Sequence, residues 1–213
     1  MEKAESSTVR DFLDALSGKS PTPGGGGASA LTGALAAALC GMVGALTAGK
    51  PKYAAVEADI LRLNGEAAAL QNELLALIDA DAAAFLPLSR AYRMPSDTAE
   101  ERAEKAAVME AAGKAAVEPP LAIMRCAAAV AKLCGEYAEK GSALAVSDAG
   151  TAAALCRAAL TGASCNVFVN TGMLTDRAYA ARLDAEAQAL LDTYLPMADE
   201  TVRRVTERLK KHD

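Results

Sequence analysis

The sequence has few aromatic residues and almost no histidine. It contains no Trp, its aromatic content is 4%, and its only histidine is His212, next to the last residue. A core built around large rings is therefore excluded. A mechanism that needs a positioned imidazole, or a metal site built on histidine, is not expected from such a sequence. We predict that the protein holds no metal ion.

Cysteines are present but form no paired motif. They are odd in number, show no CxxC spacing and lie in Ala-rich apolar stretches. The five are Cys40, Cys126, Cys134, Cys156 and Cys165. This pattern indicates buried free thiols rather than a disulfide framework, and it is typical of a reducing cytoplasm.

Signals for secretion, membrane insertion and nucleic-acid binding are weak or missing. The opening segment, MEKAESSTVRDFLDAL, is charged and lacks an apolar signal core. The most apolar run, residues 28–48, has the length of a bilayer span but little Leu, Ile or Phe to drive insertion. The net charge is −5 and the basic residues are scattered, whereas nucleic acid requires a positive stripe. We expect a cytoplasmic protein that binds neither membrane nor nucleic acid.

Alanine is the residue in excess. Of the 213 residues, 52% are hydrophobic, and alanine alone makes up roughly a quarter, far above ordinary usage. Alanine is the strongest helix former. Helices lined with it approach closely but bury little apolar area each, so they need many neighbours or a partner subunit for stability. We predict an all-α fold over residues 1–213: a single-domain bundle of long Ala-rich helices that forms a dimer.

Helical periodicity runs through almost the whole sequence, divided by glycine and proline. The predicted helices cover residues 8–16, 28–47, 53–93, 98–117, 121–139, 143–160 and 175–211. Glu118-Pro119-Pro120 halts or kinks the chain, and residues 164–173 fit either a helix or an extended segment. Because residues 28–47 are apolar on every face, they predict a central helix surrounded by protein.

The first candidate site is the glycine run in PTPGGGG, residues 21–27. A glycine run before a helix frees the N–H groups of the first turn, which attract anions and polar ligands. It lacks the Lys-Ser/Thr ending of a phosphate loop and follows no strand, so neither nucleotide motif applies. The alternative is a tight entry into a buried helix.

The second candidate is Asp81. It shares one helical face with Phe85, Leu88 and Tyr92, and that face is mainly apolar. Burial raises the pKa of a carboxyl and suits it to proton transfer near neutral pH. The alternative is a carboxylate on a solvated edge, and Asp79, about 160° away on the helical wheel, is a weaker rival.

The third candidate is the pair Ser147-Asp148, which interrupts an apolar helix and is followed by Asn166 and Asn170. Polar groups at such positions need partners, either a packing hydrogen bond between helices or a ligand. Basic residues that would steer an anionic ligand, or simply form solvated helix ends, are Lys50, Lys52, Arg90 and Arg93.

These elements, in this order, resemble a known family of folate enzymes, the cyclodeaminase/cyclohydrolase family. The resemblance covers roughly residues 7–210 and is most specific in the TPGGG element and the Ser-Asp segment. It is carried by PTPGGGGASALTGALAAALCGMV, GKPKY, Asp81-x-x-x-Phe85, Ala91-Tyr92 closed by Met94-Pro95, Pro119-Pro120 and Ser147-Asp148-Ala-Gly-Thr-Ala-Ala. The fourth glycine, Gly27, the heavy use of alanine and the proline in GKPK depart from the usual pattern.

The resemblance implies an all-helical homodimer that binds folate in a groove near the subunit interface. It implies the cyclodeaminase reaction, from 5-formimino-tetrahydrofolate to 5,10-methenyl-tetrahydrofolate and ammonia. The alternatives are a methenyltetrahydrofolate cyclohydrolase, which gives 10-formyl-tetrahydrofolate, and a non-catalytic folate-binding scaffold. No cofactor is expected beyond the tetrahydrofolate derivative that serves as substrate.

On this resemblance, Asp81 is the expected catalytic group that carries a proton between N10 and the departing nitrogen. Asp148 is the second choice, as a partner acid or a group that hydrogen-bonds the pterin. The expected substrate-binding residues are Pro23, Gly24, Gly25, Gly26, Lys52, Phe85 and Ser147. Lys50, Lys52 or Arg90 would meet the glutamyl tail.

Overall fold

Long helices make up nearly all of residues 7–210, the part of the chain that the computed structural model describes. In chain order, the elements are α1 (Val9–Leu16), α2 (Gly25–Ala45), η2 (Pro51–Val56), α3 (Glu57–Ala91), α4 (Ala99–Lys140), η3 (Ala143–Ala145), α5 (Val146–Gly172) and α6 (Arg177–Lys210). These residues contain no strand, so the all-α prediction is confirmed. His212 and Lys211 lie outside the described residues, as do residues 1–6.

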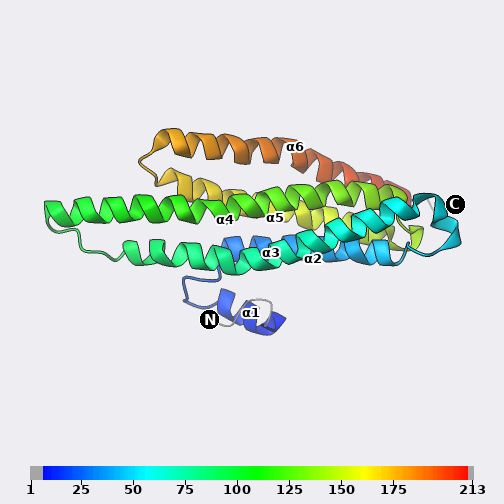
Figure 1. The fold of residues 1–213 in the computed structure, drawn as a ribbon, viewed down its shortest axis with the longest axis horizontal. Helices are drawn as coiled ribbons and strands as arrows, with labels where there is room; N and C mark the ends of the chain where they lie inside the picture. The colour runs from blue at the N-terminus through cyan, green and yellow to red at the C-terminus, as the bar shows by residue number, and fades with distance from the viewer. Residues whose placement is uncertain (1–6, 211–213) are drawn as a thin grey trace.

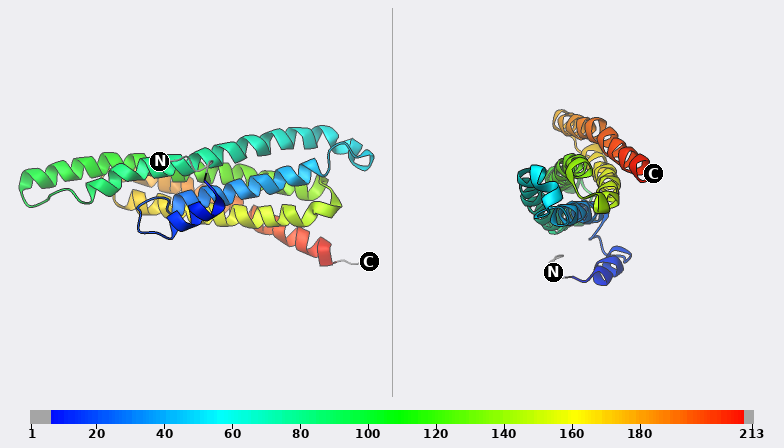
Figure 2. Two further views of the ribbon diagram at one scale, coloured as in Figure 1. Left: turned by 90° about the horizontal axis from the view of Figure 1, so that it is seen from below. Right: turned by 90° about the vertical axis from the view of Figure 1, so that its right-hand side faces the viewer.

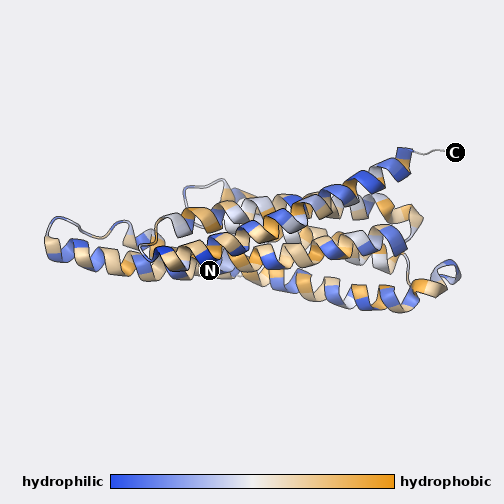
Figure 3. Ribbon diagram, turned by 90° about the horizontal axis from the view of Figure 1, so that it is seen from above, coloured by the Kyte–Doolittle hydropathy of each residue, from blue (hydrophilic) through white to orange (hydrophobic). Residues whose placement is uncertain are grey.

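Helices α2 to α5 form a four-helix bundle with short connections. Helix α2 packs against α3 and α5, α4 packs against the same two, and α6 lies on α4 and α5 (Figures 1 and 2). Helix α1 projects from the bundle (Figure 1), has no buried residue and packs on the core through Phe12. Figure 3 shows hydrophilic residues along much of the C-terminal half of α6, which ends in solvent.

Small residues let these helices approach closely. A Cβ on Gly33 would lie 3.1 Å from a methyl group of Leu74 on the neighbouring helix. At Gly44 a Cβ would overlap Asn64, whose Oδ1 accepts a hydrogen bond of 2.8 Å from the Tyr137 hydroxyl. The glycines inside α2 thus serve helix packing at these two positions, which offsets their low helix propensity.

Several expected helix boundaries differ from the structure. Helix α2 begins at Gly25 rather than at residue 28, so most of the glycine run lies inside its first turn. The segment 164–173 is helical through Gly172. Of the two outcomes expected at Pro119-Pro120, the halt was wrong, because α4 runs without interruption through both prolines.

The double proline is tolerated because the carbonyl groups it leaves unpaired find other partners. Prolines at positions 119 and 120 remove the N–H groups that would bond the carbonyls of Ala115 and Ala116. The carbonyl of Ala116 instead accepts a hydrogen bond of 2.8 Å from Asn170 Nδ2, and Ala115 is exposed to solvent.

The prediction that α2 is surrounded by protein was also wrong. Leu35 and Met42 are 51% and 49% exposed, so one side of the helix faces outward. Helix α2 and the segment Ala143–Gly172 are long and apolar enough to cross a membrane, judged by length and composition only, and each is about half buried in the bundle. Helix α2 is therefore apolar also on the side that the rest of this chain does not cover.

The cysteines are free thiols, four of them buried and Cys165 exposed. The expectation of burial fails for Cys165 because it faces outward from α5. In the core, the sulfur of Cys134 lies 3.5 Å from that of Cys40 and 3.9 Å from that of Cys156. Contact with the Cys134 thiol, together with burial, raises the pKa of Cys40, so it stays protonated and inert.

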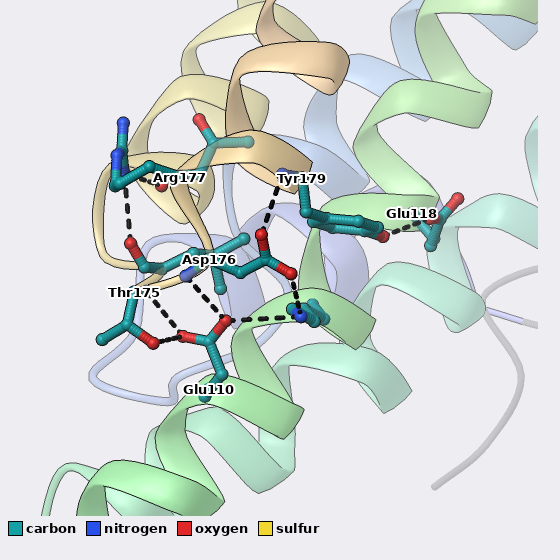
Figure 4. Close-up of polar contacts among 9 residues, drawn as sticks. Glu110, Glu118, Thr175, Asp176, Arg177 and Tyr179 are labelled. Atoms are coloured by element: carbon teal, nitrogen blue, oxygen red, sulfur yellow. Dashed lines mark hydrogen bonds and ion pairs between the residues drawn. The ribbon is translucent and has the colours of Figure 1, made fainter.

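A polar network ties the turn between α5 and α6 to the middle of α4 (Figure 4). Glu110 accepts hydrogen bonds from the backbone N–H and the hydroxyl of Thr175, at 2.6 and 2.8 Å. Lys114 lies 2.7 Å from Asp176, whose other oxygen accepts from the N–H of Tyr179 in the first turn of α6. The network therefore fixes the C-terminal end of α5 against α4, at the end of the bundle where the site lies.

Candidate functional site

A cavity of about 150 Å³ opens where α2 begins, between α3 and α5. The start of α2 contributes Gly24, Gly25 and Gly26, α3 contributes Asp81 and Phe85, and α5 contributes Asn166, Val169 and Asn170. A cavity of this size accepts one six-membered ring. The sequence predicted five of these residues as site residues, and the fold brings those five together.

Asp81 is the carboxylate of the cavity. Burial raises its pKa above the ordinary range, while a hydrogen bond from the backbone N–H of Gly27 acts in the opposite direction. Asp81 therefore lies at the positive end of α2, whose N-cap residue Gly24 offers no side chain. The raised pKa brings the carboxyl nearer to neutral pH, where it can both accept and donate a proton.

The glycine run allows the backbone of α2 to reach Asp81. A Cβ on Gly26 would overlap the carboxyl group of Asp81, and one on Gly25 would lie 3.0 Å from Asn166 Nδ2. Nothing lies within 4 Å of the corresponding point on Gly24, and a Cβ on Gly27 would make ordinary contacts, at 3.5 Å or more. The close approach therefore requires glycine at positions 25 and 26.

Asn166 and Asn170 belong to the cavity, although the sequence analysis grouped them with the Ser-Asp segment. They lie four residues apart and so share one face of α5. The signal that could have placed them is the topology: short connections make successive helices antiparallel, so the start of α2, the second half of α3 and the end of α5 meet at one end.

The same topology separates the other candidates from Asp81. The turn before α3 lies beside the start of α5, where the Ala143 N–H donates to the Tyr53 hydroxyl at 3.0 Å. Lys52 and Ser147-Asp148 therefore lie together at the opposite end of the bundle. Along α5, Asp148 is about 27 Å from Asn166 at 1.5 Å per residue. One chain does not bring these residues to the cavity.

Pro23 lines a second hollow, of about 340 Å³, between α1, the loop before α2 and α3. Asp79 lies there as well, on a different side of α3 from Asp81. Arg90 is exposed and lies nine residues beyond Asp81, on the opposite side of the α3 helix. The larger hollow is lined by Asp11 and Asp79 and so does not suit an anionic ligand.

The raised pKa of Asp81 leads to a prediction for stability. The folded protein holds the Asp81 proton at pH values where the unfolded chain has already released it. The contribution of Asp81 to the free energy of unfolding therefore falls as pH rises from the ordinary aspartate range through the folded pKa. We expect Asp81→Asn to gain stability relative to wild type over this window, measured by urea unfolding at a series of pH values. A difference that is the same at every pH would contradict the raised pKa.

The fold and the cavity define an all-α bundle that holds one partly buried acid against a glycine-rich helix start. The sequence identifies the family of this protein. Residues 8–189 match the formiminotransferase-cyclodeaminase family model, and the chain belongs to that family. The resemblance seen in the sequence is thereby confirmed.

Three similar proteins illustrate the range of the family. The chain is 43% identical to a methenyltetrahydrofolate cyclohydrolase of Methylorubrum extorquens, over 88% of this chain and 90% of that protein. It is 33% identical to the formimidoyltransferase-cyclodeaminase of Sus scrofa, over 86% of this chain but only 34% of that longer protein. A crystal structure of formiminotetrahydrofolate cyclodeaminase from Thermotoga maritima matches with a TM-score of 0.81 and 27% identity, over 97% of both chains.

Proposed function

We propose that the protein is a folate one-carbon enzyme that works at the carbon between N5 and N10 of tetrahydrofolate. The observation that carries this proposal is Asp81, whose pKa is raised by burial and which lines a cavity of the size of one ring. The chain also belongs to a family whose members act on this carbon. The folate supplies both reacting nitrogens, so the protein has to orient them and move protons.

Two reactions fit this site. In the cyclodeaminase reaction, N10 attacks the formimino carbon, Asp81 accepts the N10 proton, and the acid returns a proton to the departing ammonia. In the cyclohydrolase reaction, Asp81 accepts a proton from the water that attacks the methenyl carbon and passes it to N5. As the bond from this carbon to N5 breaks, the hydroxyl proton of the adduct leaves to solvent and 10-formyl-tetrahydrofolate forms. The carboxylate also stabilises the positive charge of the methenyl group.

The cyclodeaminase reaction is the function that the sequence suggested first, and the structural neighbour from Thermotoga maritima carries that name. The chain is also 43% identical to a cyclohydrolase of matching length, so we treat the cyclohydrolase reaction as an equal candidate. Absorbance at the methenyl-folate band separates the two. Growth of the band from 5-formimino-tetrahydrofolate with release of ammonia identifies the cyclodeaminase, and enzyme-dependent loss of the band from 5,10-methenyl-tetrahydrofolate identifies the cyclohydrolase. If neither substrate responds, the proposed function is wrong and the folate-binding scaffold takes its place.

We also propose a homodimer, formed through the outward sides of α2 and α5. Helix α2 carries no charged residue and exposes Leu35 and Met42, and its neighbour α5 exposes Phe168 and Val169. A two-fold interface brings each patch near its own copy, so an uncharged patch avoids repulsion between like charges. Val169 also lines the Asp81 cavity, so a second copy on this side would border the mouth of the site.

Charge on the exposed side of α2 tests the dimer. We expect Leu35→Glu to turn a dimer into a monomer at micromolar concentration, because it places two like charges in one interface. Sedimentation velocity measures this directly. The matched control is Leu61→Glu, whose side chain is 57% exposed on α3 and should leave the dimer intact.

A monomeric wild-type protein would contradict the dimer. Flotation of wild-type protein with lipid vesicles would contradict the proposal that a second copy of the chain covers the apolar sides of α2 and α5, because it would show that these sides contact a membrane instead. With the dimer we propose a cytoplasmic location, which the free thiols support, and no cofactor other than the folate substrate.

A further inference from the structure

The two asparagines of the cavity have side-chain amides of fixed orientation. Asn166 Nδ2 donates a hydrogen bond of 2.9 Å to the carbonyl of Gly162, and Asn170 Nδ2 donates one of 2.8 Å to the carbonyl of Ala116. A carbonyl oxygen only accepts, so in both cases the amide nitrogen must point to it. A 180° flip of either amide would set two oxygens against each other.

The anchor of Asn170 comes from the sequence of α4. Because Pro120 has no N–H, the carbonyl of Ala116 has no partner within its own helix. Asn170 is 6% exposed and supplies that partner from α5. The double proline therefore sets the polarity of the cavity: it provides a buried acceptor that holds the Asn170 nitrogen and turns the Asn170 oxygen away from α4.

Both amide oxygens remain available to a ligand. No described residue donates to Oδ1 of Asn166 or of Asn170, and no side-chain oxygen or nitrogen in the described part of the chain is both sealed from solvent and unpaired. Both residues line the cavity, and an oxygen that is unpaired but not sealed from solvent can accept a hydrogen bond from a ligand that enters it. With Asp81 they give the α3 and α5 walls three hydrogen-bond acceptors, while the first-turn N–H groups of α2 lie on the remaining side.

We infer that Asn166 and Asn170 determine which ring the cavity accepts, by receiving hydrogen bonds from N–H groups of the folate pterin, including its 2-amino group. The inference rests on the proposed function and deepens it. Residues four apart on a helix have Cβ atoms about 5–6 Å apart, so their oxygens suit two N–H donors on one edge of a flat ring. A ring that presents an acceptor or a methyl group there would leave a buried oxygen unpaired. Asp81 then stays free for proton transfer at N5 and N10.

The test compares two ligands in two proteins. The ligands are 5-formyl-tetrahydrofolate and its analogue with a methyl group in place of the 2-amino group, and calorimetry gives the Kd of each. In the wild type, we expect the analogue to bind between about 5-fold and 100-fold more weakly, the range for a buried acceptor left unpaired. In Asn166→Leu or in Asn170→Leu, this penalty should fall below 2-fold, because the oxygen that read the amino group is gone.

Matched variants separate this role from a structural one. Asn166→Gln keeps an amide that can still donate to the Gly162 carbonyl and offer an oxygen to the ligand, so it should retain the penalty if Asn166 accepts the hydrogen bond of the 2-amino group. Thr161→Val removes an exposed hydroxyl on the same helix and should change neither Kd. An analogue penalty that persists unchanged in both leucine variants would overturn the inference. Failure of wild-type protein to bind 5-formyl-tetrahydrofolate at all would overturn the proposed function instead.

Discussion

Asp81→Asn is expected to lose most of the turnover while the helical content and the oligomeric state stay as in the wild type. Asparagine has the same shape and can still accept the hydrogen bond from the Gly27 N–H, but it cannot take up and return a proton. General acid–base catalysis contributes about 10²- to 10⁴-fold to rate, and we expect a loss in that range. The measurement is kcat at the methenyl-folate band, with the substrate that the wild type uses.

The matched control is Asp148→Asn, because that carboxylate lies at the opposite end of the bundle. We expect it to retain turnover within a few-fold of wild type if the chemistry takes place in the Asp81 cavity. Wild-type activity in Asp81→Asn would remove Asp81 from the mechanism. A large loss in Asp148→Asn would indicate that the partner subunit brings its Ser-Asp segment to the site.

Gly26→Ala adds one methyl group to the site, and we expect it to reduce turnover more than the same addition at any other glycine of the run. Its Cβ would overlap the Asp81 carboxyl, so the acid or the first turn of α2 has to move. Overpacking of this kind costs about 1–3 kcal/mol of folding free energy. Because a misplacement of about 1 Å can cost 10²-fold in rate, we expect kcat to fall by about that factor even where the variant is folded.

Gly27→Ala provides the control for this effect. It adds the same methyl group one residue later, where a Cβ makes ordinary contacts with Pro23 and Ile78. Alanine also has the higher helix propensity, so Gly27→Ala should keep activity and gain up to about 1 kcal/mol in urea unfolding. Equal activities of the two variants would show that close packing of α2 on Asp81 is not needed for turnover.

The sequence predicted the helical architecture and five of the residues that line the cavity, because both depend on local pattern. The spacing of Asp81 and Phe85 on an apolar face placed the acid in low dielectric, and the glycine run marked the point where backbone comes close. Both signals lie within one or two turns of helix. The family resemblance was readable for the same reason, since its motifs are short and ordered along the chain.

Long-range placement could not be read from single motifs. Lys52 and Ser147-Asp148 lie in motifs as distinct as the glycine run, yet a bundle of antiparallel helices sends them to the other end. Asn170 finds its partner in α4, 54 residues away, through a carbonyl that a proline leaves unpaired. The exposure of α2 was missed because an all-apolar helix looks the same in sequence whether its own chain or another surface covers it.

The most direct test of the account is a crystal structure with bound 5-formyl-tetrahydrofolate, a stable relative of the proposed substrates. We predict the pterin ring that carries the 2-amino group in the cavity formed by Gly24–Gly26, Asp81, Asn166 and Asn170, with the second ring at the cavity mouth and the N5 and N10 side of the ligand nearest the Asp81 carboxyl. Ligand found instead at the opposite end of the same chain, between Lys52 and Ser147-Asp148 and away from any Asp81, would contradict it.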